Sequence, residues 1–340
     1  MVTEAPPFWW AGPDWKAWSL SPLSFLYGQA AAFRMRHAPR TPVDRPVICV
    51  GNLTVGGAGK TPTALSLARA VVADGRRPGF LSRGYAGSLG GASLVDPEHH
   101  LAREVGDEPL LLAEVAPTVV SQNRLKGAEL LIEKGVDVIL MDDGFQSARI
   151  AFDSAVLVVD SRRGLGNGHI LPAGPVRAPV SEQIRYATGI VVVGKGQAAD
   201  SVIRTAGRAA KPVFEARLVP QKPDAFRDMA VLAYAAIGDP GKFFASLEEA
   251  GARIEAERSY ADHQHLSDEQ IEDLLETAEK MNLQLVTTSK DLVRLRGLKG
   301  AAGELEKKSM VLEVQLEFDL PDAARTIIET ARANFRKRKL

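Results

Sequence analysis

The sequence is poor in cysteine and carries no net charge. Cys49 is the single cysteine among 340 residues, so the chain cannot form an internal disulfide, and its place in an apolar run predicts a buried, inert thiol. Lysine and arginine together number 42, as do aspartate and glutamate. Because these charges cancel, no bulk positive field is available to attract nucleic acid or anionic lipid. No nucleic-acid partner is expected, and any attraction to lipid has to be local.

Long hydrophobic runs are also missing, even near the N-terminus, where all four tryptophans lie within the first 18 residues. The charge-free stretch 17–33 is too short, and too interrupted by Pro22 and Gly28, to span a bilayer. Acidic residues precede it and no basic segment opens it, unlike a secretory signal peptide. Ser21-Pro22 predicts a helix start. Aromatic residues followed by arginines favour equally a helix in a membrane interface and a terminal helix packed on its own domain.

Short apolar runs alternate with helical patterns along most of the chain. The strand-like runs are 47–50, 79–82, 137–141, 154–160, 189–194 and, after a polar stretch, 231–238, 283–289 and 310–318. This alternation predicts a doubly wound parallel sheet followed by a second, smaller α/β domain. The expected division is an N-terminal interface helix region (1–40), a nucleotide-binding domain (41–218), a linker (219–228) and a smaller C-terminal domain (229–340).

A glycine-rich segment follows the first predicted strand. Residues 50–62 read VGNLTVGGAGKTP, which lacks only the first glycine of the pattern G-x-x-x-x-G-K-[ST], because position 54 is Thr. A buried strand, closely spaced glycines, a lysine, a hydroxyl and a following helix are the parts of a P-loop NTPase-type phosphate loop. The predicted nucleotide-binding residues are Thr54, Val55, Gly56, Gly57, Ala58, Gly59, Lys60 and Thr61.

A second, independent signal is an acidic pair at the end of a later strand. Asp142 and Asp143 follow four consecutive apolar residues in VDVILMDDGFQ, where a P-loop enzyme places the acids that hold Mg²⁺ with the loop hydroxyl of Thr61. The guanine-selective Asn/Thr-Lys-x-Asp pattern is absent, and Val55 replaces the extra lysine of the partitioning-type ATPases. An adenine nucleotide, ATP, is therefore expected.

Two further segments offer groups for proton transfer. GDEP at 106–109 supplies Asp107 and Glu108, and YADHQH at 260–265 supplies His263 and His265. Transfer of a phosphoryl group to an alcohol needs a carboxylate or a comparable base near the hydroxyl. Standing alone, GDEP is more typical of an N-cap acid on an exposed helix, and the histidines are more typical of a loop than of a metal site. A His-x-His pair without an obvious third ligand is a poor metal site.

The ordered motifs together resemble a known family, the tetraacyldisaccharide 4′-kinases of lipid A assembly. The resemblance covers about residues 47–297, and Thr at position 54 is normal in that family. The motifs are VGNLTVGGAGKTP, LSRGYAG, VGDEPLLLA, MDDGFQ, GLGNGHILPAGPVRAP, IGDPGKFFASL, DHQ and TTSKDLVRL.

The resemblance implies an activity and a place in the cell. These enzymes use ATP and Mg²⁺ to phosphorylate the 4′-hydroxyl of a tetraacylated glucosamine disaccharide 1-phosphate, giving lipid IVA. They have two α/β domains joined by a short β linker. Their N-terminal helix makes a peripheral contact with the cytoplasmic face of the bacterial inner membrane.

The resemblance also implies roles for individual residues. Asp107 matches the catalytic base and His263 its partner, while Lys60 acts on the transferred phosphoryl group. The expected metal ligands are Thr61, Asp142, Asp143 and Glu108. The expected contacts to the lipid substrate are Arg83, Tyr85, Arg124, Gln146 and Arg177.

Two positions depart from the family pattern, and two other functions remain open. Ser147 stands where the family often has His, and Ala178 where Glu is expected after the arginine, so substrate contacts at these positions do not carry over. A soluble kinase for small molecules or nucleosides would not need a tryptophan-rich N-terminus. In a non-catalytic P-loop switch, Asp107 and His263 would be idle.

Overall fold

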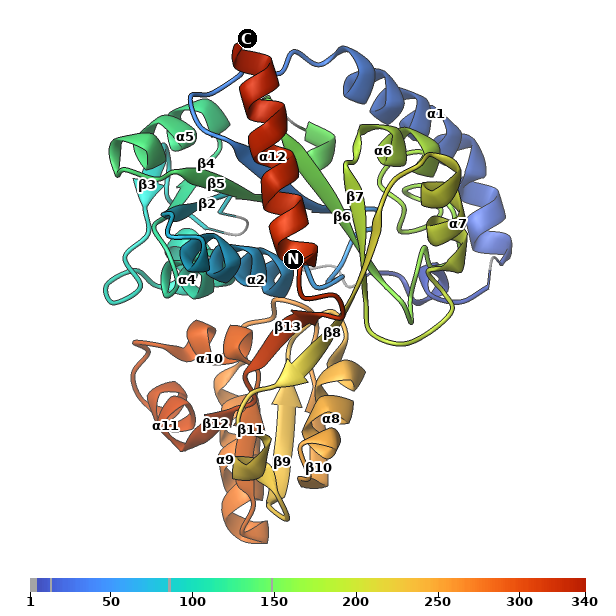
Figure 1. Ribbon diagram of the computed structural model, residues 1–340. Helices are drawn as coiled ribbons and strands as arrows, with labels where there is room; N and C mark the ends of the chain where they lie inside the picture. Colours follow the sequence, from blue (N-terminus) through green and yellow to red (C-terminus); the bar gives the residue numbers. More distant parts are fainter. Residues whose placement is uncertain (1–4, 13, 85–86, 148) are drawn as a thin grey trace.

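The computed structural model describes residues 5–12, 14–84, 87–147 and 149–340. They form a large unit around a nine-stranded sheet, ordered β13-β8-β7-β6-β1-β5-β2-β4-β3, and a smaller unit around a four-stranded sheet, ordered β10-β9-β11-β12. The two units stand one above the other in Figure 1. This architecture confirms the predicted α/β class, a doubly wound P-loop-type sheet with a second, smaller α/β unit.

The strands are β1 Val47–Asn52, β2 Pro78–Ser82, β3 Ala92–Leu94, β4 Thr118–Ser121, β5 Val138–Asp142, β6 Ser154–Asp160, β7 Gly189–Val193, β8 Val213–Pro220, β9 Ala230–Ala235, β10 Arg253–Ser259, β11 Gln284–Thr287, β12 Ser309–Val311 and β13 Val314–Phe318. The α-helices are α1 Trp15–His37, α2 Lys60–Ala73, α3 Ala102–Val105, α4 Asp107–Ala113, α5 Arg124–Glu133, α6 Val180–Tyr186, α7 Asp200–Arg208, α8 Pro240–Glu249, α9 Asp268–Met281, α10 Ser289–Leu295, α11 Ala301–Lys308 and α12 Ala323–Lys339. Short 3₁₀ turns are η1 Pro7–Trp9, η2 Phe145–Ser147 and η3 Pro223–Phe226.

The central strand β1 is buried on both faces of the large sheet. Its side chains alternate: Val47 and Cys49 pack with residues of α1, α5, α6 and α7, whereas Ile48 and Val50 pack with α2 and α12. Burial of Cys49 is confirmed, and it raises the pKa of the thiol. β1 runs parallel to β5 and β6, its neighbours on either side. The carboxyl ends of β1 and β5 therefore meet at one edge of the sheet, which is where ligands bind in folds of this kind.

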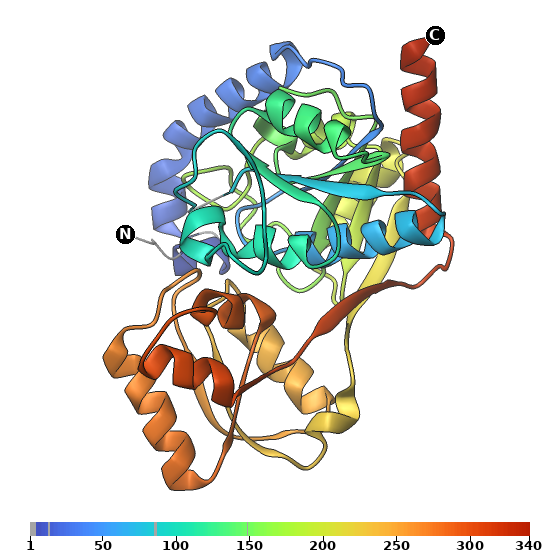
Figure 2. The same cartoon turned by 90° about the vertical axis from the view of Figure 1, so that its left-hand side faces the viewer.

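The chain crosses between the units twice, on paired strands. β8 leaves the large sheet and β13 returns to it, and the two pair in antiparallel fashion from Val314↔Pro220 to Phe318↔Ala216. Figures 1 and 2 show them side by side between the units. The predicted strand 310–318 is thus split, because β12 belongs to the small sheet and β13 to the large one.

The C-terminal helix corrects a predicted boundary. Residues 229–340 were assigned to the smaller unit, but α12 packs on α2 and β6 of the large unit, on the side away from α1 (Figure 2). Arg338 donates to the buried Asp153 (Nε–Oδ1 3.0 Å), and Asn334 donates to the carbonyl oxygen of Asp153 at 2.9 Å. The predicted linker 219–228 begins inside β8. The sequence hides this return because the basic tail looks like a solvated helix end.

Helix α1 lies along the outside of the large unit (Figures 1 and 2). It begins at Trp15, where Asp14 caps it by accepting from the N–H of Lys16 and Ala17, so the predicted start at Ser21-Pro22 is wrong. Pro22 is tolerated within the helix. The buried face consists of small residues and one methionine: Ala17, Ser24, Gly28, Ala31, Ala32 and Met35. In the part of the chain that the structure describes, no helix combines the length and apolar character needed to cross a membrane.

Candidate active site

A cleft of about 2020 Å³ separates the two units. Its walls include the glycine-rich loop and the acidic pair from the large unit, residues 260–265 from the smaller unit, and the N-terminal Trp9 and Trp10. Site residues predicted from distant parts of the sequence therefore line one cleft.

The glycine-rich loop connects β1 to α2. Gly56 and Gly59 adopt φ values of 101° and 92°, which side chains disfavour. Asn52 stabilises the loop because its side-chain Nδ2 donates to the carbonyl of Gly56 at 3.0 Å. Lys60 and Thr61 open α2 and line the cleft. The backbone amides and the positive end of α2 therefore face the space where phosphates would bind.

The structure explains why Thr is accepted at position 54. Thr54 is outside the set of residues with positive φ, so no glycine is required there. Its backbone forms an isolated antiparallel bridge with Val176, and its carbonyl accepts from Arg177 Nε at 3.1 Å. Thr54, which departs from the general phosphate-loop pattern, is thus hydrogen-bonded to the segment 175–177.

The acidic pair ends β5 beside the loop. Asp143 is bound on both oxygens by Arg177, with Nη2–Oδ2 3.2 Å and Nη1–Oδ1 3.3 Å. Burial raises the pKa of Asp143, but the charges of Lys60 and Arg177 outweigh burial and hold it below its usual value. For Asp142, burial and the nearby charge of Glu108 raise the pKa to about 7.

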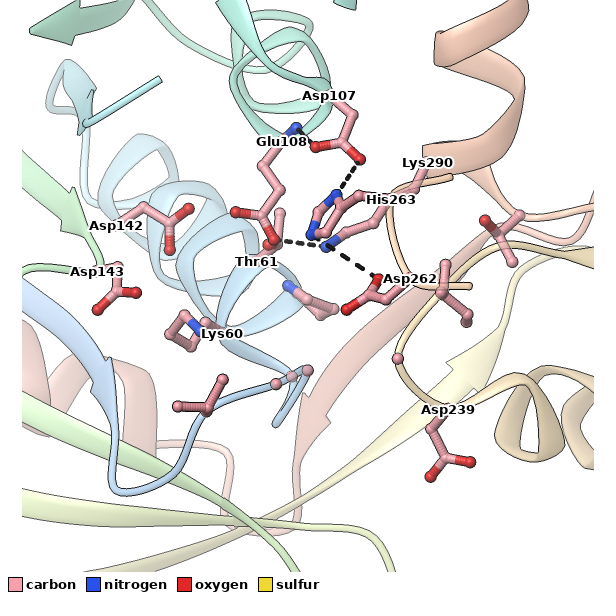
Figure 3. Close-up of a pocket in the computed structure, with 18 of the residues that line it drawn as sticks. Lys60, Thr61, Asp107, Glu108, Asp142, Asp143, Asp239, Asp262, His263 and Lys290 are labelled. Carbon is pink, nitrogen blue, oxygen red and sulfur yellow. Dashed lines mark hydrogen bonds and ion pairs between the residues drawn. The ribbon is translucent and has the colours of Figure 1, made fainter. Parts of the chain in front are cut away.

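Asp107 and His263 meet across the cleft, 156 positions apart in the chain. Asp107 opens α4 after Gly106, whose φ is 93°. His263 Nδ1 lies 3.0 Å from Asp107 Oδ2 (Figure 3), and because an ionised carboxylate only accepts, the imidazole donates. Burial raises the pKa of Asp107, but this hydrogen bond and the charge of Arg294 hold it well below its usual range. The same bond raises the pKa of His263.

Two basic residues of α10 complete this contact, and the sequence analysis missed both. Lys290 Nζ lies 2.5 Å from Glu108 Oε1 (Figure 3), and Arg294 donates from Nε to Asp107 Oδ2 at 2.9 Å. Burial lowers the pKa of Lys290, but the charge of Glu108 outweighs burial and raises this pKa above its usual value. Burial raises the pKa of Glu108, but the charge of Lys290 helps to hold it below its usual value. The motif TTSKDLVRL contains both cations, but nothing in its local pattern indicates which carboxylates they reach.

The predicted substrate contacts are partly engaged inside the protein. Arg83, Arg124, Gln146 and Arg177 all line the cleft. Gln146 Nε2 donates to the carbonyl of Asn52 at 2.8 Å. Buried Arg124 donates from Nη2 to the carbonyl of Asp143 at 3.3 Å.

Three remaining positions bear on the predicted site. Tyr85 lies outside the described residues. Ala178, where the family pattern has Glu, is buried in the core, so its side chain does not face the cleft. Among the described residues, no cluster of three His, Cys, Asp or Glu side chains forms a complete metal cage, and His265 gains no metal partners.

Comparison with known proteins decides the family. The profile of the family Tetraacyldisaccharide-1-P 4′-kinase matches residues 16–332. The chain belongs to this family. The match extends beyond the predicted 47–297 and includes α1 from its second residue. The chain is therefore an enzyme, a kinase whose reaction is the ATP-dependent phosphorylation of the 4′-hydroxyl of a tetraacyldisaccharide 1-phosphate in lipid A biosynthesis. A nucleoside kinase and a non-catalytic switch are both excluded.

Individual relatives agree with this kinase family. A tetraacyldisaccharide 4′-kinase of Agrobacterium fabrum is 58% identical, over 100% of this chain and 98% of the relative. One of Rhizobium etli is 57% identical over the same shares. Among solved structures, LpxK from Aquifex aeolicus in complex with ATP has a TM-score of 0.70 and 26% identity, covering 93% of this chain and 99% of that one.

Proposed function

We propose that the cleft between the units is where this kinase transfers the γ-phosphoryl group of ATP to the 4′-hydroxyl, giving lipid IVA. The observation that carries the proposal is the 3.0 Å contact between Asp107 and His263 in the same cleft as the glycine-rich loop. A proton acceptor and a phosphate-binding loop would thereby face one space.

The loop would hold the triphosphate. Backbone N–H groups of residues 54–61 and the positive end of α2 favour negative charge at this point. Lys60, at the first turn of α2, would neutralise charge that develops on the transferred phosphoryl group. Such contacts act mainly in the transition state, which is where they accelerate the reaction.

The residues beside the loop fit a magnesium ion. Asp142 Oδ1 is buried and has no hydrogen-bond partner in the described part of the chain, and Thr61 supplies a hydroxyl at the start of α2. Mg²⁺ takes one or two carboxylates together with phosphates and water, so a complete protein cage is not required. We assign Asp142 and Thr61 to it, with Asp143 and Glu108 close by but engaged by Arg177 and Lys290. When bound, the ion would neutralise charge on the phosphates.

The Asp107–His263 pair would accept the proton of the 4′-hydroxyl. Asp107 Oδ1 receives the N–H of Glu108 at 2.8 Å, and Oδ2 receives His263 and Arg294. Both oxygens are thus occupied, and the Asp107 side chain is only 8% exposed, against 27% for His263. We therefore treat the pair as one unit in proton transfer, with Asp107 fixing the orientation of the ring.

The lipid substrate would enter past the arginines of the large unit. Arg83, Arg124 and Arg177 line the cleft, and guanidinium groups suit the phosphate of the acceptor. Gln146 and Tyr85 complete the proposed contacts. Arg177 also clamps Asp143, so it would link substrate binding to the acidic pair.

Helix α1 would bring the enzyme to the cytoplasmic face of the inner membrane as a peripheral protein. One face is packed on the large unit, and the other leaves large apolar side chains in solvent. These exposed side chains are Trp15, Trp18, Leu23, Phe25, Leu26 and Phe33. A surface of this kind lowers its free energy by entering the boundary between headgroups and acyl chains.

The test is transfer of labelled γ-phosphate from ATP to tetraacyldisaccharide 1-phosphate in mixed detergent micelles. A water-soluble disaccharide without acyl chains and a nucleoside serve as alternative acceptors. Phosphorylation of the lipid that is lost without Mg²⁺ and falls about a hundredfold or more in Asp107→Ala supports the proposal. Equal activity on the nucleoside, or full activity in Asp107→Ala, would contradict it.

A further inference from the structure

Arg294 lies at the centre of the contact between the units, although the reaction as proposed assigns it no role. It belongs to α10 of the smaller unit, and its side chain is 6% exposed. A charge buried to this degree is costly unless several partners satisfy it.

The guanidinium group of Arg294 binds both units at once. Towards the large unit, Nε donates to Asp107 Oδ2 at 2.9 Å, and Nη2 donates to the same oxygen. Within its own unit, Nη1 donates to Asp291 Oδ1 at 2.7 Å and to the carbonyl of Ala236 at 2.8 Å. Because a guanidinium is planar and its donors point in fixed directions, these bonds fix the partners relative to one another.

The same network holds the backbone of His263. The carbonyl of Ala236 also accepts the N–H of His263 at 3.1 Å. His263 has a φ of 60°, a conformation that side chains rarely adopt and that surrounding bonds have to maintain. Arg294 therefore contacts the Asp107 oxygen that accepts from the imidazole. It also contacts the Ala236 carbonyl that accepts from the backbone N–H of His263.

We propose that Arg294 is a positioning residue for phosphoryl transfer, which holds the Asp107 carboxylate and the His263 ring in one geometry across the two units. The inference rests on the proposed role of that pair. Without the guanidinium, Asp107 and Asp291 would face each other as two buried carboxylates with no cation between them. A displacement of about 1 Å in such a pair can cost on the order of a hundredfold in rate.

Arg296 provides a matched control. It directly follows the same helix and also joins the units, through Nη1–Glu114 Oε1 at 2.9 Å. Its pair is exposed, 37% and 43%, and exposed pairs contribute little. Arg296→Gln thus removes the same kind of charge and the same kind of contact without touching Asp107.

The experiment compares steady-state kinetics of Arg294→Gln, Arg294→Lys and Arg296→Gln on ATP and the lipid acceptor in micelles. For Arg294→Gln, kcat should fall about a hundredfold or more while both KM values stay within about threefold. Lysine keeps the charge but not the forked geometry, so Arg294→Lys should lose about tenfold in kcat. Arg296→Gln should stay within about twofold of the unchanged enzyme.

Several outcomes would overturn the inference. The stoichiometry of ATP binding measures the folded fraction of each variant. A loss of kcat that only follows this fraction is structural and counts against a positioning role. A folded Arg294→Gln variant with kcat within threefold of the unchanged enzyme also overturns the inference. If Arg294→Gln does not fold, a folded Arg294→Lys variant with unchanged kcat overturns it. Asp107→Ala and His263→Ala separate the two proposals. If Asp107→Ala and His263→Ala both stay active, the proposed role of the pair and this inference are both wrong. If both are inactive while the Arg294 variants stay active, only this inference is wrong.

Discussion

The two units touch on both sides of the cleft, and the two contacts use different chemistry. On one side, which we call the catalytic rim, carboxylates of the large unit meet a histidine and two cations of the smaller one. These residues are Asp107, Glu108, His263, Lys290 and Arg294. The Asp107 and Arg294 side chains are only 8% and 6% exposed.

The opposite contact, the far rim, consists of ion pairs without a titrating imidazole. Lys242 of α8 pairs with Asp160 at the end of β6, and Arg163 Nε lies 3.2 Å from Asp239 Oδ2. Trp10 stacks on Arg163, with 4.9 Å between the guanidinium carbon and the ring centroid. The far rim thereby connects the N-terminal segment to the smaller unit.

The difference supports the proposal that the chemistry takes place at the catalytic rim. Buried ion pairs are weak evidence for stability, because removing charges from water offsets most of their attraction. A buried set that also shifts the pKa values of Asp107 and His263, beside a phosphate loop, is instead typical of an active site. At the far rim, burial lowers the pKa of Lys242 to about 8, but its described ion pairs include no carboxylate–imidazole contact, so we expect the far rim only to stabilise the closed arrangement.

The largest effect is expected between the rims, at Lys60. Lys60→Ala should lower kcat/KM by on the order of a thousandfold, about 4 kcal/mol, because the lost charge acts mainly on the transition state. Initial rates at several lipid concentrations measure it, with ATP-independent thermal unfolding as the control for folding. Turnover within threefold of the unchanged enzyme would remove Lys60 from the assigned role.

The catalytic rim should behave as one unit. Asp107→Ala and His263→Ala should each lower kcat about a hundredfold or more, and the double variant should be barely slower than the slower single. The measurement is a double-mutant cycle on kcat. Losses that multiply would mean that the two residues act separately, and an unimpaired His263→Ala would exclude the imidazole from the reaction.

The parts of the site that could be predicted from sequence are those that depend on local pattern. The strand 47–50, the glycines, Lys60 and the acids after β5 follow one another within short motifs, and their geometry comes from the fold class itself. Contacts between units are different. That Asp107 faces His263 came from resemblance to a family, and nothing local in α10 indicates that Arg294 reaches Asp107.

The errors in the fold have similar causes. β10 was missed because its exposed and half-buried residues alternate without an apolar run. The segment 310–318 looked like one strand because the break between β12 and β13 carries no glycine or proline, and only the two sheets distinguish its halves. The helix start at Ser21-Pro22 was wrong because Asp14 supplies the cap about two turns earlier.

At the far rim we expect a smaller effect of a different kind. Lys242→Met and Arg163→Gln should each raise KM by up to about tenfold and leave kcat within about twofold, because they weaken closure without touching the reacting groups. Full kinetics for ATP and lipid separate the two constants. A hundredfold loss in kcat would place chemistry at the far rim and invalidate the comparison.

The smallest effect on turnover is expected at α1, where the exposed and buried faces can be separated. Phe25 and Leu26 are 65% and 64% exposed, so replacing both with serine removes little packing inside the protein. If this face enters a membrane, each side chain contributes about 1.5 kcal/mol or more of apolar burial, and the double variant should bind vesicles at least about tenfold more weakly. Turnover on micelle-dispersed lipid should stay within about twofold.

The control is Leu320→Ser, which removes an equally exposed leucine (67%) outside α1. Vesicles of phosphatidylethanolamine and phosphatidylglycerol, sedimented with each variant, measure binding. Equal binding of the Phe25/Leu26 variant and the unchanged enzyme would show that this face of α1 stays in water. A deletion of α1 cannot decide the question, because Gly28 packs on Ile170 so closely that even a methyl group would meet it at 2.9 Å. Removing the helix would therefore expose the large unit, and unfolding would be mistaken for loss of the membrane contact.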